Sequence, residues 1–189
     1  EQTLTISNVG VRDLIWEVYE DSLQNISLTA DWVDTFDAYP LGTIDGQGGW
    51  KGWFNDPLAA GEVSDAVAFS LNNSQAIAGA ADSVHEYTGY DTGFWTYSTM
   101  TYVPADFSGL SYFQLLNSYD DMGTNLNWST AIAFSGEDNL VGNTCISGGE
   151  LPLIKGEWVE LRIDINLISD TQTAYYGDSL LYTGTWTGE

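Results

Sequence analysis

Carboxylate side chains on one strand could supply the acid and base of a glycosidase, and Glu157, Glu160 and Asp164 are the candidates. A retaining glycosidase holds its two carboxylates about 5 Å apart beside the scissile bond. Glu160 and Asp164 share one face of the predicted strand, but four residues of extended chain separate them by about 13 Å. Because Arg162 lies between them on that face, the pattern favours an ordinary ladder of charges on an outer surface.

His85 and Cys145 are the only histidine and the only cysteine of the chain. One histidine followed by Glu86 cannot form a zinc site without further imidazole or thiolate ligands. One cysteine cannot form an internal disulfide, and no nucleophile elbow marks any serine as catalytic. We therefore predict that His85 is a strand residue whose ring bonds a neighbour, that Cys145 is a small loop residue, and that the chain is not an enzyme.

Oxygen ligands for calcium are concentrated in the segment NSYDDMGTNLN. Calcium prefers the hard oxygens of carboxylates and amides. The spacing does not follow the twelve-residue EF-hand loop, so the indication comes from composition alone. A calcium site and a solvated turn both stay open as interpretations. The candidate metal ligands are Asp120, Asp121, Asn125 and Asn127.

Aromatic side chains could bind a sugar, because the apolar face of a pyranose packs on an exposed ring while amides and carboxylates bond its hydroxyl groups. The chain has eight tryptophans, and two of them lie in the glycine-rich segment GQGGWKGWFNDP. The alternative is that most of these rings fill the core or the edges of the fold. The candidates for carbohydrate binding are Trp50, Trp53, Trp95, Tyr97, Asn117, Tyr119 and Trp128.

Acidic residues outnumber basic residues by 27 to four, which gives a formal charge of −23. Such a surface repels nucleic acids and anionic membranes, so we expect neither as a partner. Like charges also destabilise the compact state by self-repulsion, which salt or calcium relieves. The sequence has no apolar run long enough for membrane insertion. These features suit an extracellular protein, secreted or on the cell surface.

Short segments with a period of two dominate wherever the sequence is regular, and turn-forming residues separate them. The pattern predicts an all-β fold of antiparallel strands. Residues 1–28 are predicted to hold a separate strand pair, and residues 29–189 the main β-sandwich. The predicted strands of the main domain are AVAFSL, SQAIAG, SVHEYTG, FWTYSTMTYVP, SYFQLLNSY, NWSTAIAF, WVELRIDINL, TQTAYY and SLLYTGTW.

The strand in EWVELRIDINL has a clear core face, whereas FWTYSTMTYV is apolar on both faces. In the second segment, alternation alone does not decide whether Trp95 and Tyr97 or Phe94 and Met100 point inward. The turn at residues 177–178, Gly-Asp, separates two apolar runs and predicts a hairpin. The predicted core face of the first segment consists of Val159, Leu161, Ile163 and Ile165.

Four blocks from about Asp34 onward resemble a concanavalin A-like, laminin-G-like jelly-roll module of large secreted bacterial proteins, some of which also carry peptidase domains. The blocks are DTFDAYPLGTIDGQGGWKGWFNDP, SVHEYTGYDTGFWTYSTMTYVPADFSG, SYFQLLNSYDD and GEWVELRIDINLISDTQTAYYGDSLLYTGTW. The preceding segment, QTLTISNVGVRDLIWEVYED, resembles the last two strands of an immunoglobulin-like domain. The resemblance implies a concanavalin A-like jelly-roll β-sandwich.

The resemblance also implies a role for the two tryptophans of GQGGWKGWFNDP. In similar modules this block is a loop that crosses the sandwich, so we expect Trp50 and Trp53 to clamp the loop over a sheet edge or an open end. A sugar platform is the alternative. Similar modules continue beyond TGTWTG, so the sandwich is expected to lack its last strands or to take them from another segment.

The sequence therefore predicts a non-catalytic extracellular module for adhesion or glycan binding in a larger secreted or cell-surface protein. A structural subunit of an extracellular filament, assembled by strand complementation between copies through their sheet edges, is a first alternative. A glycosidase or polysaccharide lyase is a second. Calcium is the expected ion, and a glycan or another extracellular ligand is the expected partner.

Overall fold

The computed structural model describes residues 32–144 and 149–187. The chain divides into two compact units, residues 1–34 and residues 35–189, and every described strand belongs to the second unit. The predicted strand pair at residues 1–28 and the loop residue Cys145 lie outside the described residues.

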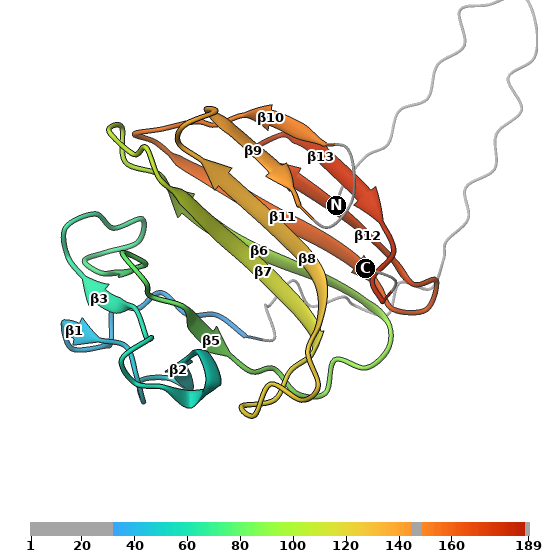
Figure 1. Ribbon diagram of the computed structural model, residues 1–189, viewed down its shortest axis with the longest axis horizontal. Coiled ribbons are helices and arrows are strands. Elements are labelled where there is room, and N and C mark those ends of the chain that lie inside the picture. Colours follow the sequence, from blue (N-terminus) through green and yellow to red (C-terminus); the bar gives the residue numbers. More distant parts are fainter. Residues whose placement is uncertain (1–31, 145–148, 188–189) are drawn as a thin grey trace, which may run out of the picture. The chain divides into compact units, whose positions relative to one another are not determined.

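Two four-stranded antiparallel sheets make up most of the second unit (Figure 1). Sheet I has the strand order β10-β9-β8-β7, and sheet II has the order β13-β12-β11-β6. The chain thus passes from sheet II to sheet I after β6 and returns after β10. Sheet I consists of β7 (Leu110–Ser118), β8 (Asn127–Ser135), β9 (Leu140–Asn143) and β10 (Glu150–Pro152). Sheet II consists of β6 (Phe94–Tyr102), β11 (Trp158–Asn166), β12 (Thr171–Tyr176) and β13 (Ser179–Gly184).

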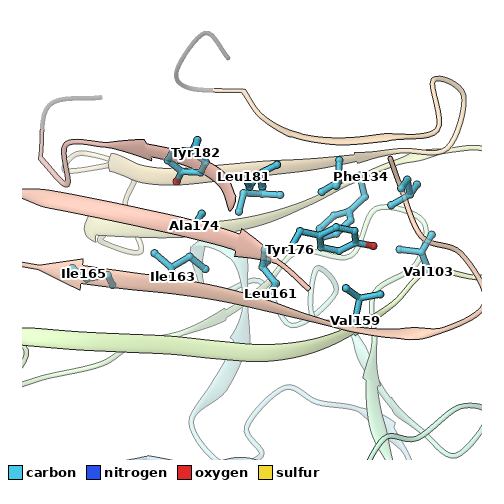
Figure 2. Packing of buried hydrophobic residues seen from close by; sticks show 13 residues of the cluster. Val103, Phe134, Val159, Leu161, Ile163, Ile165, Ala174, Tyr176, Leu181 and Tyr182 are labelled. Atoms are coloured by element: carbon cyan, nitrogen blue, oxygen red, sulfur yellow. The ribbon is translucent and has the colours of Figure 1, made fainter. Parts of the chain in front are cut away.

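The hydrophobic core lies between the two sheets, as Figure 2 shows. Strand β11 contributes to the core by strict alternation. Leu161 and Ile163 are fully buried, whereas Arg162 between them and Glu160 before them are only partly buried. Each fully buried side chain of this size contributes about 2 kcal/mol. The core face that the sequence predicts for this strand is therefore confirmed. Sheet I adds Ile132, Phe134 and Val141 to the same cluster.

Strand β6 shows which face of its two-sided apolar pattern is buried. Tyr97 pairs with the core residue Ile163 of β11, and Trp95, two residues earlier, shares that face. Trp95 packs against the core, and the ring of Tyr97 lies 5.4 Å from the ring of Phe113 in sheet I. Phe94 on the other face is 72% exposed. The pairing register with β11 therefore determines which face of β6 points into the core. Alternation within β6 alone does not reveal this register.

The hairpin between β12 and β13 turns at Gly177 and Asp178, as predicted. Gly177 has a φ of 57°, a left-handed conformation that glycine adopts without strain. Strands β9 and β10 were missed by the sequence patterns. Strand β9 has four residues including a glycine, and β10 has three residues including a proline, so neither shows clear alternation.

Two small sheets precede the sandwich in the chain. One consists of β1 (Gly42–Thr43), β3 (Glu62–Ser64) and β4 (Ser74–Ala76), and the other of β2 (Trp50–Gly52) and β5 (Ser83–His85). A single 3-10 turn, η1 (Trp53–Asn55), follows β2. Most of residues 35–93 is therefore loop, and the strands predicted at SQAIAG and SVHEYTG shorten to three residues each.

The prediction of a strand at AVAFSL is wrong, because residues 65–73 form bends without a strand partner. The carboxylate of Asp37 accepts hydrogen bonds from the Ser70 hydroxyl at 2.6 Å and from the backbone N–H groups of Asn72 at 2.7 Å and Asn73 at 3.0 Å. These bonds, with that of Ser70 foremost, hold the pKa of Asp37 well below its usual range. A side chain thus takes backbone donors that a neighbouring strand would otherwise bind.

One polar side chain bridges the two sheets inside the core. Gln172 of β12 is 1% exposed. Its carboxamide oxygen accepts hydrogen bonds from the hydroxyl groups of Thr130 on β8, at 2.5 Å, and of Tyr182 on β13, at 3.0 Å. Its nitrogen donates to the backbone oxygens of Ser129 and Thr185. All four hydrogen-bonding positions of the amide are filled, which offsets the cost of burying it.

The fold is all-β, as predicted. The described residues contain no α-helix, and every strand pair among them is antiparallel. In this described part of the chain, no helix has the length and apolarity that a membrane crossing requires.

Candidate functional site

Three of the predicted carbohydrate-binding residues, Trp53, Tyr119 and Trp128, lie together. The ring of Trp53 lies 5.0 Å from that of Tyr119 and 6.3 Å from that of Trp128, and the two indole planes are nearly parallel at 29°. The Tyr119 hydroxyl accepts a hydrogen bond from the backbone N–H of Phe54 at 3.0 Å. These contacts fasten the loop after β2 to the end of β7 and the start of β8.

Trp50 and Tyr97 belong to a second series of aromatic contacts. The ring of Trp50 lies 5.1 Å from that of His85, His85 lies 4.6 Å from Tyr87, and Tyr87 lies 6.0 Å from Tyr97. This series connects the small sheet of β2 and β5 to the inner face of β6, where Trp95 also points into the core. The aromatic rings therefore attach the loop-rich segment to the sandwich.

The block GQGGWKGWFNDP is anchored at both of its tryptophans. Trp50 joins the second series of rings, and Trp53 joins the first cluster. A Cβ atom at Gly52, between them, would overlap the carbonyl oxygen of Asp56, so glycine is needed where the loop folds back on itself. The structure thus places both tryptophans in packing contacts that hold the loop.

The seven predicted carbohydrate-binding residues do not form one exposed platform. All of them are half-buried. The amide nitrogen of Asn117 donates to the Ser129 hydroxyl at 2.8 Å and to the backbone oxygen of Trp186 at 3.1 Å. A stacking site needs a ring face open to solvent. The role of these residues in sugar binding stays a prediction.

Lys51 of β2 joins two acidic residues from distant segments. Its ammonium donates to Glu86 at 2.5 Å and to Asp121 at 2.6 Å, and it lies 5.5 Å from the centre of the Tyr119 ring. The Lys51 side chain is 17% exposed. Burial lowers the pKa of Lys51, but the hydrogen bonds to Asp121 and Glu86 outweigh burial and raise it overall. The same bond lowers the pKa of Asp121.

The predicted calcium ligands occupy a hydrogen-bonded turn. The carboxylate of Asp120 accepts from the backbone N–H groups of Met122 at 2.8 Å and Thr124 at 3.1 Å, and from the Thr124 hydroxyl at 2.9 Å. The Thr124 N–H is the main cause of the lowered pKa of Asp120. Asp121 binds Lys51, and Asn127 lies in β8. In residues 32–144 and 149–187, no three His, Cys, Asp or Glu side chains are grouped as a metal site. Calcium binding stays a prediction.

His85 is a strand residue whose ring bonds a neighbour, as predicted. It lies in β5, opposite Trp50 of β2. Its Nε2 atom lies 3.2 Å from the carbonyl oxygen of Gly48. Because a carbonyl oxygen only accepts, this contact requires the proton on Nε2.

The carboxylates of β11 have partners on the outer face of sheet II. The Ser98 hydroxyl donates to Glu160 at 2.6 Å, and the Thr96 hydroxyl donates to Asp164 at 2.9 Å. The guanidinium of Arg162 lies 3.5 Å from Asp164. The face is thus a ladder of hydroxyl, acidic and basic groups. A smaller hollow of about 310 Å³ lies beside the exposed ring of Phe94 on this face.

The outer face of sheet I contains a larger groove that the sequence did not predict. A row of paired residues crosses this sheet from Tyr112 on β7 through Ala133 on β8 and Gly142 on β9 to Glu150 on β10. Because Phe113 next to Tyr112 packs against the core, alternation directs this row to the opposite face. The central strands contribute the smallest side chains and the edge strands contribute larger ones. The resulting space of about 480 Å³ is called the outer groove.

The outer groove combines an aromatic ring with acidic groups. Tyr112 is 50% exposed, and the groove is also lined by Glu137 and Asp138, from the turn between β8 and β9, and by Glu150. The Ser135 hydroxyl donates to Asp138 at 2.7 Å. An exposed ring thus lies beside side chains that can form hydrogen bonds with a ligand. The sequence did not reveal the groove because β9 and β10, which form half of it, were not predicted.

Comparisons with protein-family models, with curated proteins and with solved structures found no match for this chain.

Proposed function

We propose that this chain is a non-catalytic, extracellular β-sandwich module of the concanavalin A-like jelly-roll type that binds a glycan in the outer groove. The observation that carries the proposal is the half-exposed ring of Tyr112 beside a floor of Ala133 and Gly142. The small floor residues leave space for a sugar, and the ring offers it an apolar face. Carboxylates on the groove walls can accept hydrogen bonds from its hydroxyl groups.

The fold and the charge support this assignment. Two four-stranded antiparallel sheets around one core are compatible with a jelly-roll sandwich. The charge of −23 suits an extracellular medium with abundant cations. The carboxylates on the regular strand β11 are bonded to neighbouring hydroxyl groups, which favours a binding module over a glycosidase or lyase.

Titration calorimetry with a panel of purified oligosaccharides tests the proposal. We expect at least one oligosaccharide to bind, and we expect Tyr112→Ala to weaken its binding about tenfold, which corresponds to about 1.4 kcal/mol. The matched control is Phe94→Ala, which removes an exposed aromatic ring from sheet II instead. The control should bind like the parent chain.

Two results would contradict glycan binding in the outer groove. The first is that no oligosaccharide of the panel binds. The second is that Tyr112→Ala and Phe94→Ala lose the same affinity, since the ring of Tyr112 would then have no particular role.

Self-assembly by strand addition is a second candidate function. Strand β13 forms one edge of sheet II, and within the described ranges only β12 pairs with it. An edge strand of six residues can accept a strand from another copy. Light scattering on the dilute chain tests this candidate: a growing polymer is expected if copies exchange strands, and a monomer at every concentration contradicts it.

A further inference from the structure

The charged residues that line the outer groove are all acidic. Glu137, Asp138 and Glu150 carry carboxylates, and no lysine or arginine lines the groove within the described residues. Tyr112 and Glu150 stand at the two ends of one row, separated by three strand spacings or about 14 Å. A ligand that stacks on Tyr112 and follows the row across the sheet therefore approaches the carboxylate of Glu150.

Two of these carboxylates are available to a ligand. The side chains of Glu137 and Glu150 are exposed, and their carboxylates form no hydrogen bond or ion pair with other described residues. Asp138 differs, because it accepts a hydrogen bond from the Ser135 hydroxyl at 2.7 Å and so helps to shape the turn. Within the described residues, no ion pair neutralises the carboxylates of Glu137 and Glu150.

The described basic side chains form no ion pair with the carboxylates of the outer groove. Lys51 binds Glu86 and Asp121 in the loop-rich segment. Arg162 lies over the ring of Tyr175 on sheet II, with its guanidinium carbon 4.2 Å from the ring centre. Lys155 donates to the backbone oxygens of two residues beside the groove, Phe107 at 2.8 Å and Gly136 at 3.1 Å, and forms no ion pair with a described acid.

We infer that the outer groove selects glycans that carry free amino groups over neutral and acidic glycans. This inference rests on the proposed function. A protonated sugar amine forms a charge-assisted hydrogen bond with a carboxylate, which is about twice as strong as a neutral one. A uronic acid or sulfate group would instead meet like charge, which lowers affinity and slows association. Charge complementarity thus favours one class of ligand, glycans built from glucosamine.

The test compares three tetrasaccharides by titration calorimetry at pH 6: glucosamine, N-acetylglucosamine and galacturonic acid oligomers. The first two differ at the amine, and short oligomers avoid the multivalent adhesion that a long polycation shows toward any acidic protein. We expect the glucosamine oligomer to bind at least tenfold more tightly than its N-acetylated counterpart. We expect no binding of the galacturonic acid oligomer.

A pair of charge-matched variants separates the groove from the overall charge. Glu150→Gln should reduce the preference for the amine, measured as the ratio of the affinities for the glucosamine and N-acetylglucosamine oligomers, at least fivefold. Glu157→Gln removes the same charge from an exposed position outside the groove and should behave like the parent chain. Circular dichroism shows whether each variant is folded.

Failure of this inference differs from failure of the proposed function. If the N-acetylated oligomer binds and Tyr112→Ala abolishes that binding, but the amine gives no advantage, the amine selectivity is wrong and the glycan site stands. Equal losses for Glu150→Gln and Glu157→Gln also overturn the selectivity, because the preference would then reflect total charge. If no oligosaccharide binds, both proposals are wrong.

Discussion

The carboxamide oxygen of Gln172 in sheet II accepts a hydrogen bond from the hydroxyl of Thr130 in sheet I at 2.5 Å, so one buried side chain links the two layers of the sandwich. Replacement of Gln172 by alanine leaves the hydroxyl groups of Thr130 and Tyr182 and two backbone oxygens without their partner. We expect the free energy of unfolding to fall by about 3 kcal/mol, as measured by urea denaturation.

Gln114→Ala is the control for this change. Gln114 lies on the outer face of β7 and is exposed, so its loss should alter the free energy of unfolding by less than about 0.5 kcal/mol. If both variants unfold at the same urea concentration, the buried amide does not contribute as we argue.

Lys51→Met should lower the melting temperature in a pH-dependent way. The pKa of Asp121 is lowered from 3.8 by Lys51, so this stabilisation exists above that value and disappears as pH falls through the lowered pKa. The pKa of Lys51 is raised from 10.5, so its contribution exists below that value and disappears as pH rises through the raised pKa. Because Glu86 and Asp121 are 54% and 40% exposed, water screens the pairs and the effect should be small.

Thermal melts at pH values from strong acid to strong alkali test the pH range in which Lys51 stabilises the fold. The difference between Lys51→Met and the parent chain should be largest from about pH 5 to about pH 9. The control is Lys155→Met, which removes an ammonium that binds two backbone oxygens and no carboxylate among the described residues. Its effect on the melting temperature should not decrease as the pH falls into the acid range. A difference for Lys51→Met that stays constant in acid would contradict the ion pairs.

Asp37→Ala should release the segment of residues 65–73. The carboxylate of Asp37 bonds the Ser70 hydroxyl and the backbone N–H groups of Asn72 and Asn73, and its pKa is lowered by these bonds, that of Ser70 first. This anchoring therefore exists at neutral pH and disappears in acid as the carboxylate is protonated. Limited proteolysis at pH 7 should cut the variant faster within residues 65–73. An unchanged cleavage pattern would show that the carboxylate does not hold the loop.

The melting temperature should rise with salt. With 27 acidic and four basic residues, the folded chain repels itself. An increase in ionic strength from about 0.01 M to about 0.15 M shortens the Debye length from about 30 Å to about 8 Å and screens this repulsion. Scanning calorimetry across a sodium chloride series measures the effect. A melting temperature that does not change would mean that self-repulsion is unimportant for stability.

Calcium should raise the melting temperature more than sodium at equal ionic strength if the turn at Asp120 binds it, and Asp120→Asn should remove that additional rise. Asparagine keeps an oxygen for the bonds from Met122 and Thr124. Asp91→Asn, a charge-matched change at another exposed position, is the control. Equal effects of the two ions on the parent chain would contradict the calcium site.

Strands with a strict alternation of apolar and polar residues were predictable from the sequence. Features that depend on which strands pair were not. The core face of β11 follows from its own pattern, because every second residue is aliphatic from Val159 to Ile165. The orientation of Trp95 in β6 depends on register with β11, which no pattern within β6 contains. The segment AVAFSL has a strand pattern, but the carboxylate of Asp37 holds the chain beside it in a loop.

The candidate site shows the same limit. The sequence directed attention to aromatic rings, but it does not distinguish a ring that packs, such as Trp53 against Trp128, from one that faces solvent, such as Tyr112. The outer groove depends on Ala133 and Gly142 standing side by side on neighbouring strands. That adjacency is a property of the sheet, and it becomes visible only when the pairing of β8 with β9 is known.

The pairing of β6 with β11 has a consequence for how the chain folds during synthesis. Phe94 of β6 pairs with Asn166, so the first strand of sheet II to be made meets its partner only after all of sheet I has been made. Until then Trp95 and Tyr97 cannot be buried against β11. Closing so long a segment costs entropy before any contact repays it, which makes folding slow. A chain still attached to the ribosome would therefore expose an incomplete, aggregation-prone sheet. Chaperones that shield such surfaces would bind longest to residues 94–157.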